Sequence, residues 1–390
     1  MSATGIHALV VGDRFIGADL FAGALEAAAD QAGVPLTIKQ LQIDYPAVDA
    51  VPLPTLAPAA PPRPLWEDPQ EAVARAGADL SADPVIREYT GPVDLLVPHL
   101  AGIEALLVHL APVSRNAVDA ADRLRAIGCA RGGAVNLNQQ RINERGIPVF
   151  YCPGRNARAV AEYVMGGVLA LSRGIAAGSA GIADGLWRLD LYSYALAGPE
   201  LYGRTCGIVG FGGVGRAFAP IARGFGLRLL VHDPYVNEDE VRAAGAEPVD
   251  LDILLSSSQI VVLAARLSDE TRGLIGMAEL ALLQPNCIFV NPARAELVDT
   301  AALADALERR AIAGAVIDVF SPEPPVAHDR LLSLDNVLLT PHIAGASKDA
   351  AERGAQVVCR KLVAYLADGS LDGVLNRAAV EQATMAGGAQ

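Results

Sequence analysis

A glycine-rich stretch in the middle of the chain limits the possible folds most strongly. Gly210-Phe211-Gly212-Gly213-Val214-Gly215 directly follows the apolar run 206–209 and opens a helical pattern. In such a strand–turn–helix setting the first glycine permits the tight turn, the second lets a pyrophosphate approach the backbone, and the third lets the helix pack closely on its strand. The free N–H groups at the helix start favour a phosphate's negative charge. The stretch therefore predicts a dinucleotide site, whereas a glycine-rich turn without a ligand is the alternative.

An acidic residue at a suitable distance indicates which dinucleotide is bound. Asp233 follows Gly215 by 18 residues, close to the spacing of about 20 expected for the acid that binds the ribose hydroxyls of adenosine. A carboxylate there repels the extra phosphate of NADP, and Pro234 and Tyr235 supply no cation for it. We therefore expect NAD as the cofactor.

Short apolar runs alternate with helical patterns around this stretch, which predicts an α/β fold with a doubly wound parallel sheet. The six runs expected as strands are 206–209, 229–231, 260–263, 288–290, 315–317 and 337–339. A long helical pattern at 157–173 precedes them. We predict an NAD-binding domain at 156–345, inserted into a second Rossmann-like domain.

The second domain is expected to bind substrate and to be discontinuous, formed by residues 1–155 and 346–390. Its expected strands are 7–11, 36–43, 94–97, 105–109, 124–128 and 147–151, with a helix at 18–32. A C-terminal helix at 349–367 should return to this domain, followed by a weakly structured end. Pro46 and Pro64 enclose five further prolines, and this density predicts an extended insertion, which is either a plain surface loop or a protein-binding segment.

Composition excludes several other classes. A formal net charge of −13 disfavours nucleic acid or an anionic membrane as the main partner and leaves small molecules and proteins. The five cysteines have no C-x-x-C spacing, so neither a zinc site nor a disulfide framework is expected. No uncharged run reaches the roughly 18 apolar residues of a membrane helix. We expect a soluble, cytoplasmic protein without a bound metal.

Three charged or titratable residues each follow one of the later predicted strands: Arg294, Glu323 and His342. Hydride transfer to or from a carbinol carbon needs a group that takes or gives the hydroxyl proton, and histidine titrates nearest neutral pH. A neighbouring carboxylate orients the imidazole, and an arginine can grip a substrate carboxylate with two hydrogen bonds. Singly, each residue has an ordinary surface interpretation, but their joint placement predicts a proton-transfer site.

Together these motifs resemble the D-isomer-specific 2-hydroxyacid dehydrogenase family, of which phosphoglycerate dehydrogenase is the best-known branch. The resemblance covers about 124–345, in the order of the family's motifs. The matching segments are 146–149, 156–162, 210–215, 271–275, 291–299, 318–324 and 341–345. It implies a D-2-hydroxyacid dehydrogenase that is commonly a homodimer through its cofactor domains.

The resemblance also assigns roles to residues. Arg294 would bind the substrate carboxylate and carbonyl, His342 would be the acid/base with Glu323 as its partner, and Asp318 would hold the nicotinamide carboxamide. The glycine-rich loop with Arg131, Gly132 and Gly133 would hold the substrate carboxylate. The cofactor site is expected to comprise Gly210, Phe211, Gly212, Gly213, Val214, Gly215, Asp233, Ala264, Ala265, Thr271, Pro292, Ala293, Arg294, Asp318, His342 and Gly345.

Several residues depart from the family pattern. Ala295 replaces a glycine after the arginine, and Ala265 and Arg266 stand where histidine and proline are common. Arg266 either meets a phosphate of the cofactor or substrate or faces solvent. The loop arginine is displaced to Arg131, and His109 is either structural or close to the substrate.

Two functions from different classes remain open at this stage. The first is an NAD-dependent oxidoreductase that interconverts a 2-hydroxy acid and its 2-oxo acid, like phosphoglycerate dehydrogenase or a hydroxypyruvate/glyoxylate reductase. The second is an NAD(H)-sensing, corepressor-like interaction protein on the same fold. The complete proton-transfer set favours the enzyme.

Overall fold

The computed structural model describes residues 5–43, 83 and 85–387. These residues form two compact units, of which one is Asn156–Ala346 and the other contains the described residues before Asn156 and from Ser347 onward. We call them the cofactor unit and the outer unit. The proline-rich segment expected at 46–64 lies outside the described residues.

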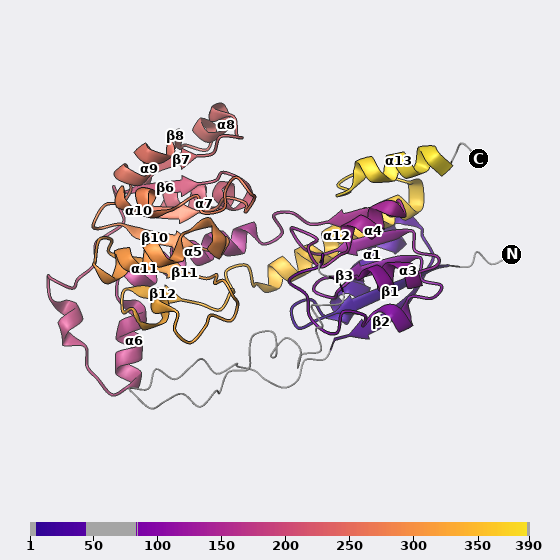
Figure 1. Cartoon of the computed structure of the whole chain (residues 1–390), viewed down its shortest axis with the longest axis horizontal. Helices are drawn as coiled ribbons and strands as arrows, with labels where there is room; N and C mark the ends of the chain where they lie inside the picture. The colour runs from indigo at the N-terminus through magenta and orange to yellow at the C-terminus, as the bar shows by residue number, and fades with distance from the viewer. Residues whose placement is uncertain (1–4, 44–82, 84, 388–390) are drawn as a thin grey trace. The chain divides into compact units, whose positions relative to one another are not determined.

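The outer unit is built on a five-stranded parallel sheet in the order β2-β1-β3-β4-β5. Figure 1 labels its strands β1, β2 and β3. Its strands are β1 (Ile6–Gly12), β2 (Leu36–Gln42), β3 (Ala105–Val108), β4 (Ala126–Cys129) and β5 (Val149–Tyr151). Side chains of each strand point alternately to the two faces, so Ala8 and Val10 pack into one core and Leu9 and Val11 into the other. The sheet is therefore buried on both sides, as parallel sheets require.

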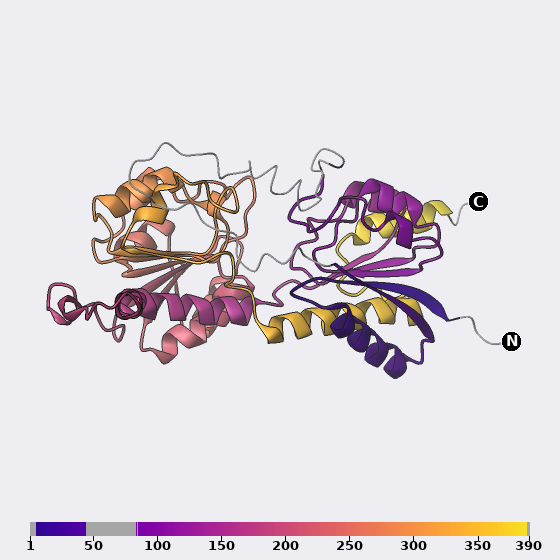
Figure 2. The same cartoon turned by 90° about the horizontal axis from the view of Figure 1, so that it is seen from below.

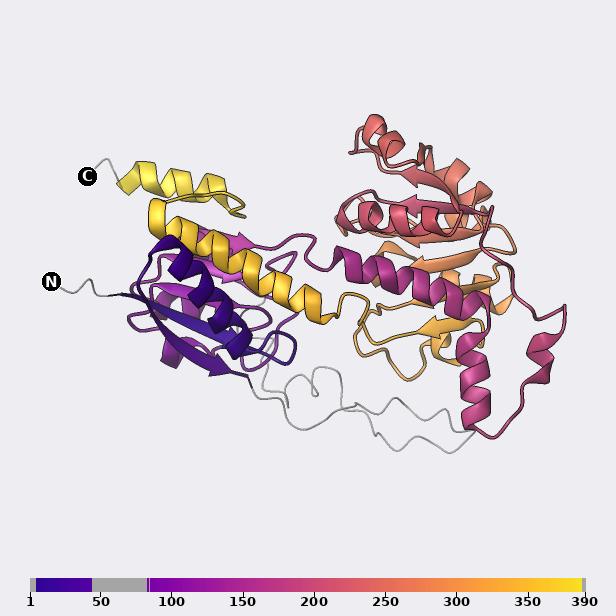
Figure 3. The ribbon, with the colours of Figure 1, turned by 180° about the vertical axis from the view of Figure 1, so that it is seen from behind.

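Helices cover both faces of this sheet (Figure 2). The helices are α1 (Ala18–Ala32), η1 (Val97–His99), α3 (Arg115–Ala120), α4 (Gln139–Glu144), α12 (Lys348–Asp368) and α13 (Arg377–Gly387). The helix α12 packs beside α1 although more than 300 residues separate them in sequence (Figure 3). Ser347 caps its N-terminus, where the side chain accepts from Ala350 N, and Gly369 ends it in the left-handed conformation.

The cofactor unit has a seven-stranded parallel sheet in the order β12-β11-β10-β9-β6-β7-β8. Its strands are β6 (Thr205–Val209), β7 (Arg228–His232), β8 (Glu247–Pro248), β9 (Ile260–Leu263), β10 (Ile288–Asn291), β11 (Gly314–Ile317) and β12 (Val337–Leu339). The strand order reverses beside β6, so ligands are expected at the carboxyl ends of these strands.

Two layers of helices also enclose this second sheet (Figure 2). On one face lie α5 (Ala157–Ser172) and α7 (Gly213–Gly224), and on the other lie α9 (Leu251–Ser257), α10 (Met277–Ala281) and α11 (Thr300–Glu308). The remaining helices are α6 (Ile175–Ala183), η2 (Leu189–Tyr192), α8 (Glu238–Ala243), η3 (Ala295–Leu297) and η4 (Arg330–Ser333). The predicted α/β, doubly wound class is confirmed in both units.

Two sequence predictions about the outer unit are wrong. Residues 94–97 form a turn that leads into η1 and not a strand, because Pro98 lacks the N–H of a ladder and Asp94 accepts hydrogen bonds from Ser114 and Asn116. Residues 377–387, expected to be weakly structured, form α13, which packs on α4 and buries Val380.

No single helix of the described chain is long and apolar enough to cross a membrane. Only α5 and α6 taken together pass that test of length and composition, and they are bent by 66°.

Candidate active site

The glycine-rich turn lies between β6 and α7, at the carboxyl edge of the second sheet. Gly210 has a φ of 94°, and a Cβ there would lie 2.5 Å from Ala265 N. A Cβ on Gly215 would lie 2.5 Å from the Gly210 carbonyl oxygen, so both glycines are required by close backbone approach. Gly212, by contrast, has no atom within 4 Å of its Cβ position. The open space lies at the N-terminus of α7, where a pyrophosphate fits.

Asp233 follows β7 and faces this turn. One carboxylate oxygen accepts from Phe211 N at 2.7 Å and the other from Tyr235 N at 3.0 Å. These two amides fix the carboxylate, and each of its oxygens keeps a further lone pair for a ribose hydroxyl. The donors and acceptors at this edge therefore fit NAD.

Gly212→Ala is expected to weaken NADH binding by roughly tenfold or more and to leave the free energy of unfolding nearly unchanged. The added Cβ meets no protein atom but occupies the space through which the pyrophosphate approaches. Fluorescence titration with NADH and thermal melting measure the two quantities. Gly224→Ala, also open at its Cβ position but at the far end of α7, is the matched control. Equal NADH affinity in both variants would contradict the assignment of the turn.

His342 and Glu323 form a direct pair after β12 and β11, which are neighbouring strands. His342 Nδ1 lies 2.8 Å from Glu323 Oε2, and Glu323 Oε1 accepts from Phe320 N at 3.0 Å. The hydrogen bond to Glu323 raises the pKa of His342 against the opposing effect of burial. Burial pushes the Glu323 pKa upward, but the hydrogen bonds from His342 and Phe320 and the charges of His342 and Arg294 together outweigh it, and the pKa is lowered. The arrangement leaves His342 Nε2 as the nitrogen that can exchange a proton.

The loop that carries His342 is anchored by Asp318, which is fully buried. Its Oδ1 accepts from Thr340 Oγ1 at 2.6 Å and Ile343 N at 2.8 Å, and its Oδ2 accepts from Ala344 N at 2.7 Å. His342 itself has a φ of 54°, a conformation that non-glycine residues seldom adopt. Asp318 thus binds the Thr340 side chain before the strained histidine and two backbone amides after it. Its role toward the nicotinamide stays a prediction.

Sequence reasoning missed the second layer of this anchor. Tyr163, on α5, lies with its hydroxyl 2.5 Å from Thr340 Oγ1, which in turn donates to Asp318. Burial raises the pKa of Tyr163 to about 12, so the phenol stays neutral and can donate. In the sequence, Thr340 stands two residues before His342, but nothing in the sequence indicates that it contacts Tyr163.

Arg294 follows β10 and begins η3. Its charge lowers the pKa of both His342 and Glu323, so the three residues predicted from sequence act on one another electrostatically. Nη1 donates to the Ala293 carbonyl at 2.7 Å, and Asn291 Nδ2 donates to the Arg294 carbonyl at 2.9 Å. The backbone here is held by Asn291, even though Ala295 replaces the family's glycine.

The remaining predicted cofactor positions lie around the same edge. Ala264 and Ala265 follow β9 and approach the Gly210 turn, and the Cβ position of Gly345 lies 2.2 Å from Asn156 Nδ2. Pro292 is buried directly after β10. Thr271 Oγ1 donates to the Arg266 carbonyl at 2.6 Å and closes its own loop, whereas Arg266 is exposed. Their contact with a cofactor stays a prediction.

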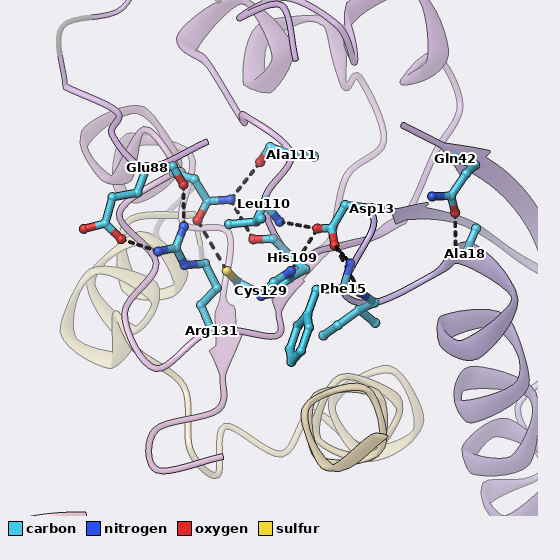
Figure 4. Close-up of polar contacts among 12 residues, drawn as sticks. Asp13, Phe15, Ala18, Gln42, Glu88, His109, Leu110, Ala111, Cys129 and Arg131 are labelled. Carbon is cyan, nitrogen blue, oxygen red and sulfur yellow. Dashed lines mark hydrogen bonds and ion pairs between the residues drawn. The ribbon is translucent and has the colours of Figure 1, made fainter. Parts of the chain in front are cut away.

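The predicted substrate loop lies in the outer unit, directly after β4 (Figure 4). The guanidinium of Arg131 donates to the carboxylate and the main-chain carbonyl of Glu88. Gly132 and Gly133 are exposed. The Cβ position of Gly133 has no atom within 4 Å, and that of Gly132 has only Pro153 Cα, at 3.9 Å. The backbone amides are thus accessible, while the charge of Arg131 is already paired.

Together these features define a dinucleotide-dependent dehydrogenase with a histidine–carboxylate pair and an arginine in one unit. The sequence profile of the D-isomer specific 2-hydroxyacid dehydrogenase NAD-binding domain matches residues 165–344. Glyoxylate reductase of Korarchaeum cryptofilum (strain OPF8) is 36% identical over 254 residues, or 65% of this chain and 76% of that protein.

Two further likenesses agree. D-3-phosphoglycerate dehydrogenase of Methanocaldococcus jannaschii is 35% identical over 272 residues, or 69% of this chain and 51% of that protein. The solved apo-structure of Escherichia coli D-lactate dehydrogenase shares the fold with a TM-score of 0.69 and 23% identity, over 95% of this chain and 100% of that one. The chain belongs to the D-isomer-specific 2-hydroxyacid dehydrogenase family, and it is an NAD-dependent enzyme.

Proposed function

We propose that the protein reduces a short 2-oxo acid to the D-2-hydroxy acid with NADH, and catalyses the reverse oxidation, in the manner of a glyoxylate/hydroxypyruvate reductase or a phosphoglycerate dehydrogenase. The observation that carries this proposal is the 2.8 Å bond between His342 and Glu323, within the electrostatic reach of Arg294. The names of the relatives, glyoxylate reductase and D-3-phosphoglycerate dehydrogenase, support the substrate class.

Each residue has a distinct task in this proposal. The bound nicotinamide supplies or accepts the hydride. Arg294 grips the substrate carboxylate and polarises the carbonyl, and Gly132 and Gly133 donate backbone amides to the same carboxylate. In reduction, protonated His342 gives its Nε2 proton to the carbonyl oxygen, and in oxidation neutral His342 takes it back. Glu323 orients the ring and stabilises the imidazolium.

The pH dependence of reduction is expected to follow His342. Because the pKa of His342 is raised by Glu323, the protonated form persists below that pKa and is lost as pH rises through it. The kcat/KM of reduction should therefore fall with rising pH, and that of oxidation should rise over the same interval. Glu323→Gln removes the partner charge and should move both transitions to lower pH. Stopped-flow pH profiles of the two directions measure this, and unmoved transitions in the variant would assign them to another group.

The proposal is tested by NADH oxidation against glyoxylate, hydroxypyruvate, phosphohydroxypyruvate and 2-oxoglutarate, with NADPH in parallel. Turnover of at least one acid with NADH, and much slower turnover with NADPH, is expected because Asp233 repels a 2′-phosphate. NADH binding without turnover of any acid would overturn the proposal and favour the NAD(H)-sensing alternative.

We also propose that the protein is a cytoplasmic homodimer. The segment 175–202 of the cofactor unit extends away from its sheet (Figure 3) and exposes a series of large apolar side chains. They are Ile175, Ile182, Leu186, Trp187, Leu189, Tyr192, Tyr194, Leu196 and Tyr202. An apolar surface of this kind supports a subunit contact. Analytical ultracentrifugation distinguishes a dimer from a monomer.

The proposed cytoplasmic location rests on the cysteines. All five cysteines are free and buried, which suits a reducing compartment.

A further inference from the structure

A second histidine–carboxylate pair lies in the outer unit, outside the site described above. His109 directly follows β3 and Asp13 directly follows β1, and their side chains are 2.8 Å apart through Nδ1 and Oδ2 (Figure 4). Both residues are at least 95% buried. Asp13 also accepts from the amides of Phe15, Ile16 and Leu110.

The other ring nitrogen of His109 faces a guanidinium. Arg155 Nη2 lies 2.9 Å from His109 Nε2. A guanidinium can only donate, so Nε2 must be the acceptor and Nδ1 must carry the proton that is given to Asp13. Burial is the largest influence and lowers the pKa of His109, the hydrogen bond and charge of Asp13 oppose it, and the charges of Arg155 and Arg131 add to the lowering. His109 is therefore neutral near pH 7.

This arrangement orients Arg155 without neutralising it. An ion pair with a carboxylate, like that of Arg131 with Glu88, would neutralise the positive charge of Arg155. Instead, a neutral imidazole separates the guanidinium from Asp13, while the Phe15 ring lies 5.1 Å below it. Among the residues that the structure describes, Arg155 makes no ion pair, and its two accepting partners are His109 and, at 3.4 Å, the Ala350 carbonyl. Three of its five N–H donors remain for a ligand.

Further cations surround the same edge. The guanidinium of Arg353, on α12, donates to the Arg155 carbonyl. Burial raises the pKa of the Cys152 thiol, but Lys361, Arg155, Arg353 and Arg360 all act to lower it. In a chain with a net charge of −13, such a local concentration of positive charge favours an anion.

The position in the fold is that of a ligand site. The strand order of the outer sheet reverses at β1 and β3, and Asp13 and His109 stand at the carboxyl ends of these strands. Arg155 also lies beside the exposed glycine loop, because Cys152 N donates to the Arg131 carbonyl at 2.9 Å and the Gly132 Cβ position lies 3.9 Å from Pro153 Cα.

We propose that Arg155, aimed by neutral His109 and Asp13, binds a second anionic group of the substrate, a phosphate or a carboxylate remote from C2. Arg155 is then a specificity-determining residue, and His109 and Asp13 are positioning residues. The inference rests on the proposed function, since one carboxylate is already assigned to Arg294 and the glycine loop, and Arg155 adds a charge beyond that need.

Matched substrate pairs test this inference with the full-length enzyme. Phosphohydroxypyruvate differs from hydroxypyruvate by one phosphate, and 2-oxoglutarate differs from 2-oxobutyrate chiefly by one carboxylate. In Arg155→Gln the KM of at least one doubly charged acid is expected to rise by roughly 10- to 100-fold. The KM of its singly charged counterpart should change by less than about threefold, and kcat should be preserved. The pair that responds identifies phosphate or carboxylate as the ligand.

A second variant separates positioning from folding. His109→Phe keeps a ring but removes the acceptor for Arg155. It should therefore raise the KM of the same doubly charged acid, by less than Arg155→Gln does, and leave the KM of the singly charged acid unchanged. His109→Gln, which offers both an acceptor and a donor, should restore part of that selectivity. Arg141→Gln, which replaces a partly exposed, ion-paired arginine of the same unit, is the control and should behave as wild type. Thermal melting of each variant reports on the fold.

The outcomes distinguish this inference from the proposed function. If wild-type enzyme reduces hydroxypyruvate but Arg155→Gln raises the KM of all acids equally, Arg155 binds the common C1 carboxylate and the inference is wrong. If Arg155→Gln changes no KM, the cluster is purely structural and the inference is again wrong. Failure of every acid with the wild type would instead overturn the proposed function.

Discussion

Replacing His342 by asparagine is expected to lower kcat by about 10²- to 10⁴-fold in both directions, while NADH affinity stays within about threefold of wild type. The loss follows from removal of the only group that the proposal assigns to proton transfer. Asparagine is chosen because it tolerates the φ of 54° at this position better than most residues. The loop should therefore keep its form, anchored by Asp318.

Single-turnover kinetics, NADH titration and thermal melting together measure this prediction. Glu323→Gln is the companion variant, because it keeps the imidazole but removes the charge beside it, and its loss of kcat should be smaller. A His342→Asn enzyme with wild-type turnover would remove His342 from the mechanism. A variant that loses both NADH binding and stability would show a structural effect and no specific catalytic role.

Arg294→Lys is expected to lower kcat/KM for the 2-oxo acid by about 10²- to 10⁴-fold. Two charge-assisted hydrogen bonds contribute about 3–6 kcal/mol together, and lysine keeps the charge but cannot form the planar fork. The fold should be preserved, because lysine keeps the positive charge at this position and can still donate to the neighbouring Ala293 carbonyl. NADH affinity should stay close to wild type.

Steady-state kinetics with NADH and a reactive 2-oxo acid measure the effect. Arg294→Ala should lose activity, and added guanidinium ion should restore part of it, because the ion supplies the two parallel N–H donors that the side chain provided. Such rescue would support the assignment. Normal 2-oxo acid kinetics in Arg294→Lys would show that another residue binds the carboxylate.

The parts of the fold that sequence predicts correctly are those with strong local signals. Every strand of the cofactor unit except the two-residue β8 coincides with an apolar run, because buried parallel strands need apolar side chains on both faces. The Gly210 turn also has a strong local signal: Gly215 is required by its contact with the Gly210 carbonyl within the turn, although Gly210 itself also meets the distant Ala265.

The two wrong predictions fall where contacts between segments distant in sequence, and not the local residue pattern, determine the backbone conformation. The apolar run at 94–97 has the composition of a strand, but Pro98 and the hydrogen bonds of Asp94 determine a turn. The last helix, α13, is held in place by the preceding Asn376, whose side chain accepts from Val149 N and donates to the Ile147 carbonyl. No local pattern reveals such partners.

The polar clusters show the same limit. Arg294, Glu323 and His342 could be grouped because each follows a strand of one sheet, and strand ends meet at one edge. Asp13 and His109 are 96 residues apart, and Arg155 is 46 residues beyond His109, so their contact depends on the strand order of the outer sheet. The anchoring of the His342 loop by Asp318 is likewise visible only once β11 and β12 are paired.

Transfer of label from NADH tests the central claim most directly. The enzyme is incubated with NADH that carries deuterium at both positions of nicotinamide C4 and with hydroxypyruvate or glyoxylate, and the product is analysed by NMR and mass spectrometry. We expect deuterium at C2 of the hydroxy acid, with D configuration where C2 is a stereocentre that NMR of a chiral derivative resolves. Oxidation of NADH without deuterium at C2, or binding of NADH with no product from any 2-oxo acid, would contradict the account.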